Sequence, residues 1–215
     1  MENTITKIEI QKRNKNRVNI FIDKDFAFAC STELVFTYGL KENKVIESEK
    51  LLQIVDEDNY LKCKETALKI VEKSYKTEKE MINKLKLKGY DDKTIDKVIN
   101  FLINYNFLND ENYVEMYIKD KIKTEGKNKI RYSLLKKGIS EEIIENKIND
   151  IDTYLEMDNA LKLAEKKYKT LIKTEKDTKK IYKKLGDFLL RKGYTFEETK
   201  QILNKVVVTK DFEEY

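Results

Sequence analysis

The chain has 215 residues, of which 40% are hydrophobic and 39% are charged, and its formal net charge is +5. No apolar run approaches the roughly 18 residues that span a bilayer, and the N-terminal MENTITKIEI lacks the apolar segment of a signal peptide. We therefore expect a cytoplasmic protein without membrane association. The two cysteines form no CxxC motif and histidine is absent, which argues against a disulfide framework, a zinc finger and a histidine base.

The charge is distributed unevenly along the chain. Residues 160–193 contain 12 lysines and arginines against 4 acidic residues, whereas residues 1–60 contain 9 against 11. Lysine, asparagine, isoleucine and tyrosine are all abundant, which indicates a compositional bias of the source genome as much as selection for a basic surface. The total charge therefore says little about a partner, but its placement predicts one basic region near the C-terminus.

The first thirty residues alternate between apolar and polar positions in three short runs, TKIEIQK (6–12), RVNIFI (17–22) and FAFAC (26–30). A period of two over β-branched and aromatic residues predicts strands. The polar segments RNKN (13–16) and DKD (23–25) are typical turns between them. We expect a three-stranded antiparallel meander, which is too small to be stable alone and should pack on a helix.

Beyond the meander the pattern predicts only helices. Ser31 or Thr32 can cap a short helix that ends near Gly39, and helices follow from about Ser48. The clearest covers residues 92–105, with a predicted buried stripe of Ile95, Val98, Ile99, Leu102 and Ile103. Before it, Thr77 and Glu80 have the spacing of a capping box.

A sequence repeat becomes visible when three glycines are aligned. LKLKGY (85–90), LLKKGI (134–139) and LLRKGY (189–194) each end a predicted helix, at offsets of 49 and 55 residues. A cap candidate (Asp91, Ser140 or Thr195) and another amphipathic helix follow each glycine, and a further helix precedes each block, at about 59–74, 111–124 and 154–172. Repeats of this length predict stacked units that bury their apolar faces against one another.

The expected fold is therefore mainly α, an elongated array of three tandem three-helix repeats with a small N-terminal three-stranded antiparallel β meander. We expect the following boundaries: 1–57 for the meander with short connecting helices, 58–108, 109–152 and 153–210 for the repeats, and 211–215 for an acidic tail.

No motif for catalysis, metal binding or nucleotide binding occurs in the chain. GxxxxGK[ST], GxGxxG, HExxH, GxSxG and an EF-hand loop are all missing. The acidic pairs Glu141–Glu142 and Glu197–Glu198 fall in predicted first helical turns, where they complement the helix dipole. Cys30 and Cys63 are expected to be small buried residues. We therefore expect no enzyme activity and no cofactor.

The basic residues before the second and third glycines allow two interpretations. Cations in a last helical turn are favourable in themselves, by about 0.3–1 kcal/mol. The run KYKTLIKTEKDTKKIYKKL (167–185), however, interleaves lysines with tyrosines, and such a face could follow a phosphate backbone or meet an acidic protein surface. Lysines distributed around a solvated helix remain the plain alternative.

Three segments together resemble the RecX family, bacterial regulators of RecA recombinase. They are KGYDDKTIDKVINFLINYNFLNDENYVEMYI (88–118), GKNKIRYSLLKKGIS (126–140) and LGDFLLRKGYTFEETKQIL (185–203). ITKIEIQKRNKNRVNIFIDKDFAFAC (5–30) resembles the N-terminal extension of some members, so that the resemblance covers nearly the whole chain in order. At residues 73–77 the chain reads KSYKT, where members often carry an arginine-rich R-x-R-S.

The resemblance implies a cytoplasmic, monomeric, non-enzymatic protein that binds the RecA–DNA filament and restrains its growth, ATP hydrolysis and strand exchange. Candidate residues for contacting RecA or DNA, chosen at equivalent or neighbouring places in the second and third repeats, are Arg131, Lys136, Lys137, Lys183, Lys184, Arg191 and Lys192. The alternative hypothesis is a nucleic-acid-binding repeat protein that acts without RecA, and it predicts tight, salt-sensitive binding to naked DNA or RNA.

Overall fold

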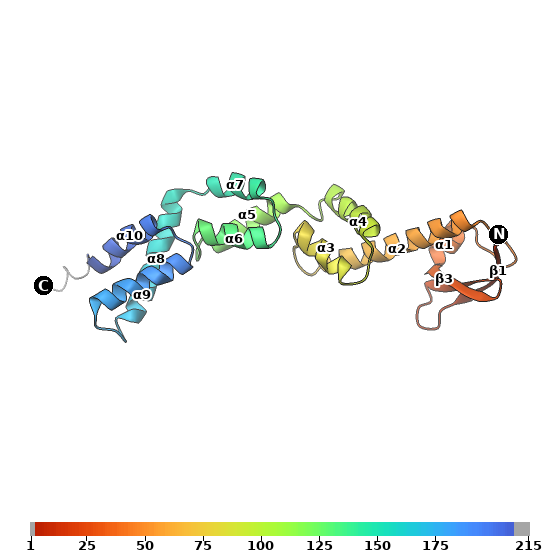
Figure 1. Ribbon diagram of the computed structural model, residues 1–215, viewed down its shortest axis with the longest axis horizontal. Helices are drawn as coiled ribbons and strands as arrows, with labels where there is room; N and C mark the ends of the chain where they lie inside the picture. Colours follow the sequence, from red (N-terminus) through yellow and green to blue (C-terminus); the bar gives the residue numbers. More distant parts are fainter. Residues whose placement is uncertain (1–2, 209–215) are drawn as a thin grey trace. The chain divides into compact units, whose positions relative to one another are not determined.

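The structure, a computed structural model, describes residues 3–208, which form two compact units (Figure 1). Unit 1 contains residues 3–75 and 81–107, and unit 2 contains residues 76–80 and 108–208. The expected acidic tail, residues 211–215, lies outside the described residues.

The chain forms the predicted meander followed by helices, but one helix of 24 residues replaces the separate helices that were expected before and after residue 58. The first part of the chain forms β1 (Asn3–Ile10), β2 (Arg17–Ile22), β3 (Asp25–Ser31), α1 (Thr32–Thr37), β4 (Val45–Ile46), α2 (Ser48–Val71), α3 (Glu78–Lys86) and α4 (Asp92–Asn104). The second part forms α5 (Asp110–Lys121), α6 (Lys127–Lys136), α7 (Glu141–Asn149), α8 (Thr153–Leu171), α9 (Thr178–Arg191), α10 (Phe196–Leu203) and the π-helical turn η1 (Asn204–Val208). The mainly helical prediction is confirmed.

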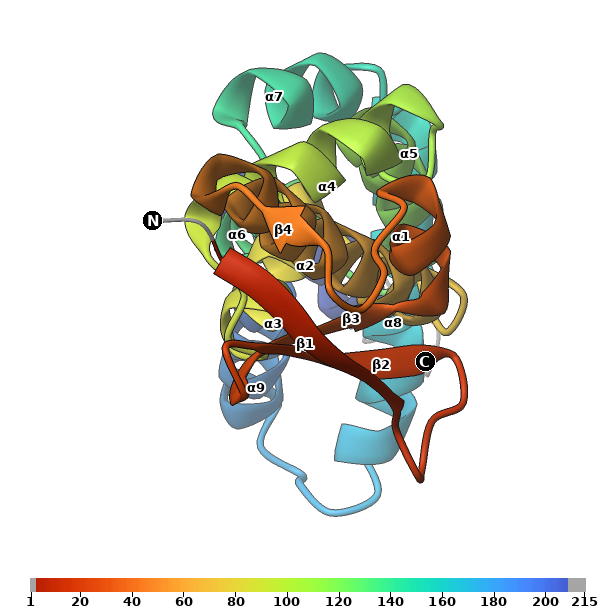
Figure 2. The same ribbon diagram turned by 90° about the vertical axis from the view of Figure 1, so that its right-hand side faces the viewer.

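The three predicted strands, β1 to β3, form an antiparallel sheet together with a fourth strand, in the order β3-β2-β1-β4. Ile8 pairs with Ile20, and Val18 pairs with Cys30, as a meander requires. The fourth strand is an addition to the prediction, because its two residues are too few to show an alternating pattern. Figure 2 shows the sheet with α1 and α2 beside it. The buried side chains of the sheet pack against Leu34 of α1 and Ile54 of α2.

A buried carboxylate fastens the sheet to α2. Asp58 is 2% exposed and accepts two hydrogen bonds of 3.0 Å from the Arg17 guanidinium and one of 3.1 Å from the Ser31 backbone N–H. Lys62 lies 2.6 Å away on the next turn of the helix. Burial alone would raise the pKa of Asp58, but these donors outweigh it and lower the pKa. The sequence analysis did not identify this network.

Helix α2 is continuous over 24 residues. It contains no glycine and the chain contains no proline, so nothing interrupts the helix between the part that packs on the sheet and the part that packs on α4. Cys63 lies on this helix and Cys30 on β3, and both are buried and unpaired, as predicted.

The second and third helices of each repeat begin and end as the sequence predicts. Asp91, Ser140 and Thr195 each cap the helix that follows. In α4 the predicted stripe is buried at Ile95, Val98, Ile99 and Leu102, but Ile103 is 38% exposed and that part of the prediction is wrong. Helix α4 packs on α2 through a stripe narrower than predicted, and Ile103 falls outside it.

The aligned leucines of the three repeats are buried, and those of the second and third repeats lie in apolar cores. Leu85, Leu134 and Leu189 are each 0% exposed. In the second repeat Leu134 packs with Val114 of α5 and the isoleucines of α7. In the third, Leu189 packs with two alanines of α8 and with α10. Figure 1 shows α8, α9 and α10 gathered into one such three-helix group.

Candidate partner-binding surface

The start of α3 and the end of α6 are joined by hydrogen bonds within unit 2. The Thr77 hydroxyl donates to the Lys137 carbonyl over 2.7 Å, and the Lys137 ammonium lies 2.6 Å from Glu80. Thr77 and Glu80 also complete the predicted capping box, with reciprocal bonds of 3.2 and 3.3 Å. Asp110, the first residue of α5, accepts a bond of 3.0 Å from the Glu78 backbone N–H. The segment 76–80 therefore meets the C-terminal end of α6, where the Thr77 hydroxyl bonds to a carbonyl at the helix end.

The start of α6 and the end of α9 repeat this arrangement. The Gly126 backbone N–H donates to the Lys192 carbonyl over 2.8 Å. Glu156 of α8 is 1% exposed and accepts a bond of 3.0 Å from the Lys127 backbone N–H, while the Lys127 ammonium lies 3.3 Å from the same carboxylate. Glu156 thus replaces the side-chain cap that Gly126 cannot supply. We call these two helix-to-helix contacts the α3/α6 joint and the α6/α9 joint.

Two structural features favour glycine over any other residue at position 193, directly after α9. Gly193 has a φ of +94°, a left-handed conformation that side chains disfavour. A Cβ atom there would also lie 2.5 Å from the Lys129 backbone nitrogen. Gly89 has nearly the same conformation, with φ at +87°, but no described atom lies within 4 Å of the position of its Cβ.

The predicted contact residues of the second repeat are engaged inside the protein. Arg131 lies 2.5 Å from Glu145 and 3.5 Å from Glu141. The Lys136 ammonium lies 4.5 Å from the centre of the Tyr132 ring. Burial alone would lower the pKa of Lys137, but its bonds to Glu80 and to Tyr113 raise the pKa to about 12. Lys137 is therefore first a component of the α3/α6 joint.

The third repeat leaves more of its cations unused. Lys184 pairs with Glu175 over 2.9 Å, and Lys192 lies 5.9 Å from the centre of the Phe188 ring. Lys183 and Arg191 are exposed, and neither has a carboxylate within 4.0 Å among residues 3–208. The same holds, within that range, for a further set of exposed lysines: Lys166, Lys169, Lys173, Lys176, Lys179, Lys180 and Lys200.

Lys200 is the residue that the sequence analysis missed. It lies on α10, outside the basic segment, and lines the same groove as Lys183 of α9. Only the packing of α10 against α9 brings the two lysines to one place. Both would favour an anionic partner, since unpaired cations on a surface are available to an incoming phosphate or carboxylate.

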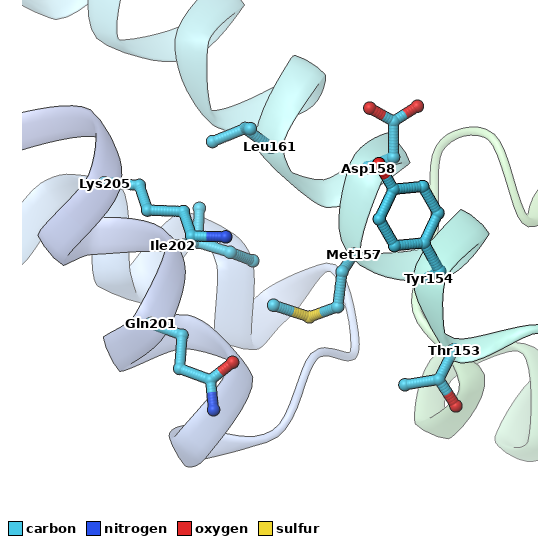
Figure 3. Close-up of a pocket in the computed structure, with 8 residues that line it drawn as sticks. All are labelled: Thr153, Tyr154, Met157, Asp158, Leu161, Gln201, Ile202 and Lys205. Atoms are coloured by element: carbon cyan, nitrogen blue, oxygen red, sulfur yellow. The ribbon is translucent and has the colours of Figure 1, made fainter.

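No group of three or more metal-ligating side chains occurs among the described residues. Burial raises the pKa of both the Cys30 and the Cys63 thiols to about 11, so neither is an activated nucleophile. A cavity of about 420 Å³ lies between α8 and α10, where Met157 and Leu161 face Ile202 (Figure 3). Its one carboxylate, that of Asp158, pairs with Lys162, which leaves it no acid–base partner.

No helix in the part of the chain that the structure describes has both the length and the apolar character needed to cross a membrane.

Family models match four successive segments of the chain. The regulatory protein RecX N-terminal domain matches residues 3–47, and the first, second and third three-helix domains of RecX match residues 63–102, 109–147 and 155–203. The match thus follows the order of sheet and repeats described above.

Relatives of similar length extend this likeness over the whole chain. The regulatory protein RecX of Clostridium tetani is 53% identical over 205 residues, covering 95% of each chain. The regulatory protein RecX of Clostridium perfringens strain 13 is 50% identical and covers 94% of this chain and 95% of its own. A crystal structure of regulatory protein RecX superposes with a TM-score of 0.70 at 24% identity, covering 93% of this chain and 98% of that one. These matches and the three repeats show that the chain belongs to the RecX family of regulatory proteins.

Proposed function

We propose that this protein binds the RecA–DNA filament and lowers the recombinase, ATPase and strand-exchange activities of RecA, and thereby regulates DNA repair. Its membership of a family of regulatory proteins supports a regulatory role. The observation that carries the proposal is that two of the predicted contact residues, Lys183 and Arg191, are exposed and have no ion-pair partner among residues 3–208.

The mechanism we propose is occupancy of the filament. The three repeats offer a succession of similar surfaces, and a RecA filament offers a succession of identical protomers. A chain that contacts neighbouring protomers competes for the space that DNA strands and new protomers need. This competition means that the protein binds better to a filament from which DNA strands and new protomers are excluded than to an active one. Binding therefore shifts the population toward inactive or shorter filaments.

The direct experiment is titration of the protein into a preformed filament of RecA on single-stranded DNA, with the ATPase rate and the filament length measured together. We expect both to fall as the protein is added. An unchanged ATPase rate with demonstrable binding would contradict the inhibitory function.

The seven candidate residues are tested by charge reversal in two groups. The first group is Lys183, Lys184, Arg191 and Lys192 of the third repeat, and the second is Arg131, Lys136 and Lys137 of the second repeat. We expect reversal of the first group to weaken inhibition with little change in stability, since Lys183 and Arg191 have no ion-pair partner among residues 3–208. Because Lys137 and Arg131 make internal ion pairs, reversal of the second group should destabilise the protein as well.

The second candidate function, nucleic-acid binding without RecA, is supported by the same unpaired lysines. It predicts tight binding to naked single-stranded DNA that weakens steeply with salt, because each neutralised phosphate releases a counterion. Weak binding to naked DNA together with strong binding to the filament would favour the RecA-dependent function.

A further inference from the structure

A groove runs between α9 and α10 in the third repeat. Its volume is about 360 Å³, near the lower end of the roughly 300–1,000 Å³ of typical ligand sites. Its apolar lining comes from Tyr182, Gly186, Leu190, Phe196 and Leu203. Lys183 and Asp187 of α9 and Lys200 of α10 supply its charges.

Two apolar side chains of the lining are exposed to solvent. Phe196 is 74% exposed and Leu190 is 43% exposed, although both belong to helices with well-buried opposite faces. Gly186 lies inside α9, where glycine is unfavourable relative to alanine. A Cβ atom at Gly186 would lie 3.4 Å from a methyl group of Leu203, an ordinary van der Waals contact, so the glycine leaves open space that a methyl group would fill.

Thr199 of α10 also lines the groove and is 3% exposed. Its γ-methyl group lies 3.9 Å from the Cβ position at Gly186 and so adds to the apolar floor. Among residues 3–208, Lys183, Asp187 and Lys200 make no ion pair. The groove therefore combines an apolar floor with charged groups that have no ion-pair partner among the described residues.

We propose that this groove binds an acidic protein segment that carries one large apolar side chain. The apolar side chain would occupy the floor beside Phe196, and flanking carboxylates would pair with Lys183 and Lys200. Asp187 can accept a backbone N–H, which an extended peptide offers. This inference rests on the proposed function, and the segment would belong to the protein partner in the filament.

Nucleic acid fits the groove less well. The Asp187 carboxylate in the lining repels phosphates and carboxylates alike, but a peptide backbone offers it an N–H donor that offsets the repulsion, and a phosphodiester backbone offers none. The floor offers aliphatic as much as aromatic surface, whereas nucleobase sites depend on stacking against aromatic rings. A cationic rim around an apolar floor is the complement of an acidic segment with an apolar anchor.

The test compares two charge reversals of equal size in the full-length protein. The groove variant is Lys183→Glu with Lys200→Glu, and the control is Lys166→Glu with Lys173→Glu, at exposed unpaired lysines that do not line the groove. We expect the groove variant to weaken binding to the RecA filament at least about tenfold and the control less than about threefold. Phe196→Ala, a change at an exposed side chain, should weaken binding about fivefold or more.

A second measurement separates the site from the proposed function. The peptide acetyl-EEFEE-amide is titrated into the protein alone, and backbone NMR shifts are followed, with acetyl-EEAEE-amide and a deoxythymidine oligonucleotide as comparisons. We expect the EEFEE peptide to shift α9 and α10 residues, the EEAEE peptide to shift them less, and the groove variant to abolish the effect.

The outcomes are distinct. If the filament is not bound but the EEFEE peptide shifts the groove residues, the proposed function fails and the groove assignment is upheld. If both double variants weaken filament binding equally, or if the oligonucleotide shifts the groove residues more than the peptide does, the assignment is overturned.

Discussion

In the second repeat, Lys137 ends its helix with its ammonium on Glu80 and its carbonyl on the Thr77 hydroxyl. In the third, Lys192 uses its carbonyl in the same way, but its ammonium lies over the ring of Phe188 and makes no ion pair among the described residues. The two repeats thus share a backbone arrangement and differ in what the lysine ammonium contacts. Residues at equivalent sequence positions therefore form the two joints, whereas the neighbouring elements decide which cations remain available to a partner.

The largest effect should come from closing the space at the α6/α9 joint. Gly193→Ala adds a Cβ at 2.5 Å from a backbone nitrogen to the strain of a left-handed conformation, and together these should cost about 2–5 kcal/mol. Gly89→Ala is the matched control, because it carries the strain without the close contact, and it should cost about 1–2 kcal/mol. Urea unfolding of both variants measures the difference. Equal losses in the two variants would mean that the α6/α9 joint accommodates the added Cβ with no further loss of stability.

Removing the buried charge at the same joint should have the next largest effect. Glu156→Gln keeps an acceptor for the Lys127 N–H but leaves the Lys127 ammonium, whose side chain is 26% exposed, without its carboxylate. We expect a loss of about 1–3 kcal/mol in the free energy of unfolding. Asp158→Asn on the same helix breaks a surface pair with Lys162 and should change little. Similar values for the two variants would show that Glu156 has no structural role.

At the α3/α6 joint, Lys137→Met should cost about 1 kcal/mol near neutral pH. The pKa of Glu80 is lowered despite its burial, chiefly by the bond from Lys137, so its contribution is present above its unfolded pKa of about 4.3 and is lost as the pH falls through the folded pKa. Lys137, with a pKa of about 12, contributes below about pH 10.4 and loses that contribution as the pH rises through 12. The gap between wild type and variant should therefore shrink below pH 4. A gap that is constant down to pH 3 would exclude the ion pair as its cause.

The smallest effect on stability, and the sharpest contrast between the repeats, is expected at the unpaired cations. Lys183→Ala with Arg191→Ala should change the free energy of unfolding by less than about 0.5 kcal/mol, because neither side chain has an ion pair among residues 3–208. The same double variant should weaken the inhibition of RecA ATP hydrolysis. Wild-type inhibition by this variant would remove both residues from the proposed contact surface.

Local chemistry along the chain was enough to predict most elements of this protein, but not the two-residue strand β4 or the uninterrupted course of α2. Alternating residues predicted three strands, and the leucine and glycine spacing predicted three helical repeats with caps at Asp91, Ser140 and Thr195. These features depend on residues close in sequence, whose periodicity and turn preferences act before any long-range contact forms. The buried positions of Cys30 and Cys63 followed from the same reasoning.

Only the tertiary structure decided which charged side chains form ion pairs within the protein and which face solvent. Asp58 meets Arg17 across 41 positions of sequence, Glu80 meets Lys137 across 57, and Lys183 shares a groove with Lys200 only because α10 packs on α9. A lysine at a helix end reads the same in sequence whether it holds a joint or faces solvent, because its role depends on what another element places within about 4 Å of its ammonium. The sequence of LLRKGY (189–194) therefore determined a helix end and a turn, while packing left Arg191 unpaired and set the Lys192 carbonyl in a joint.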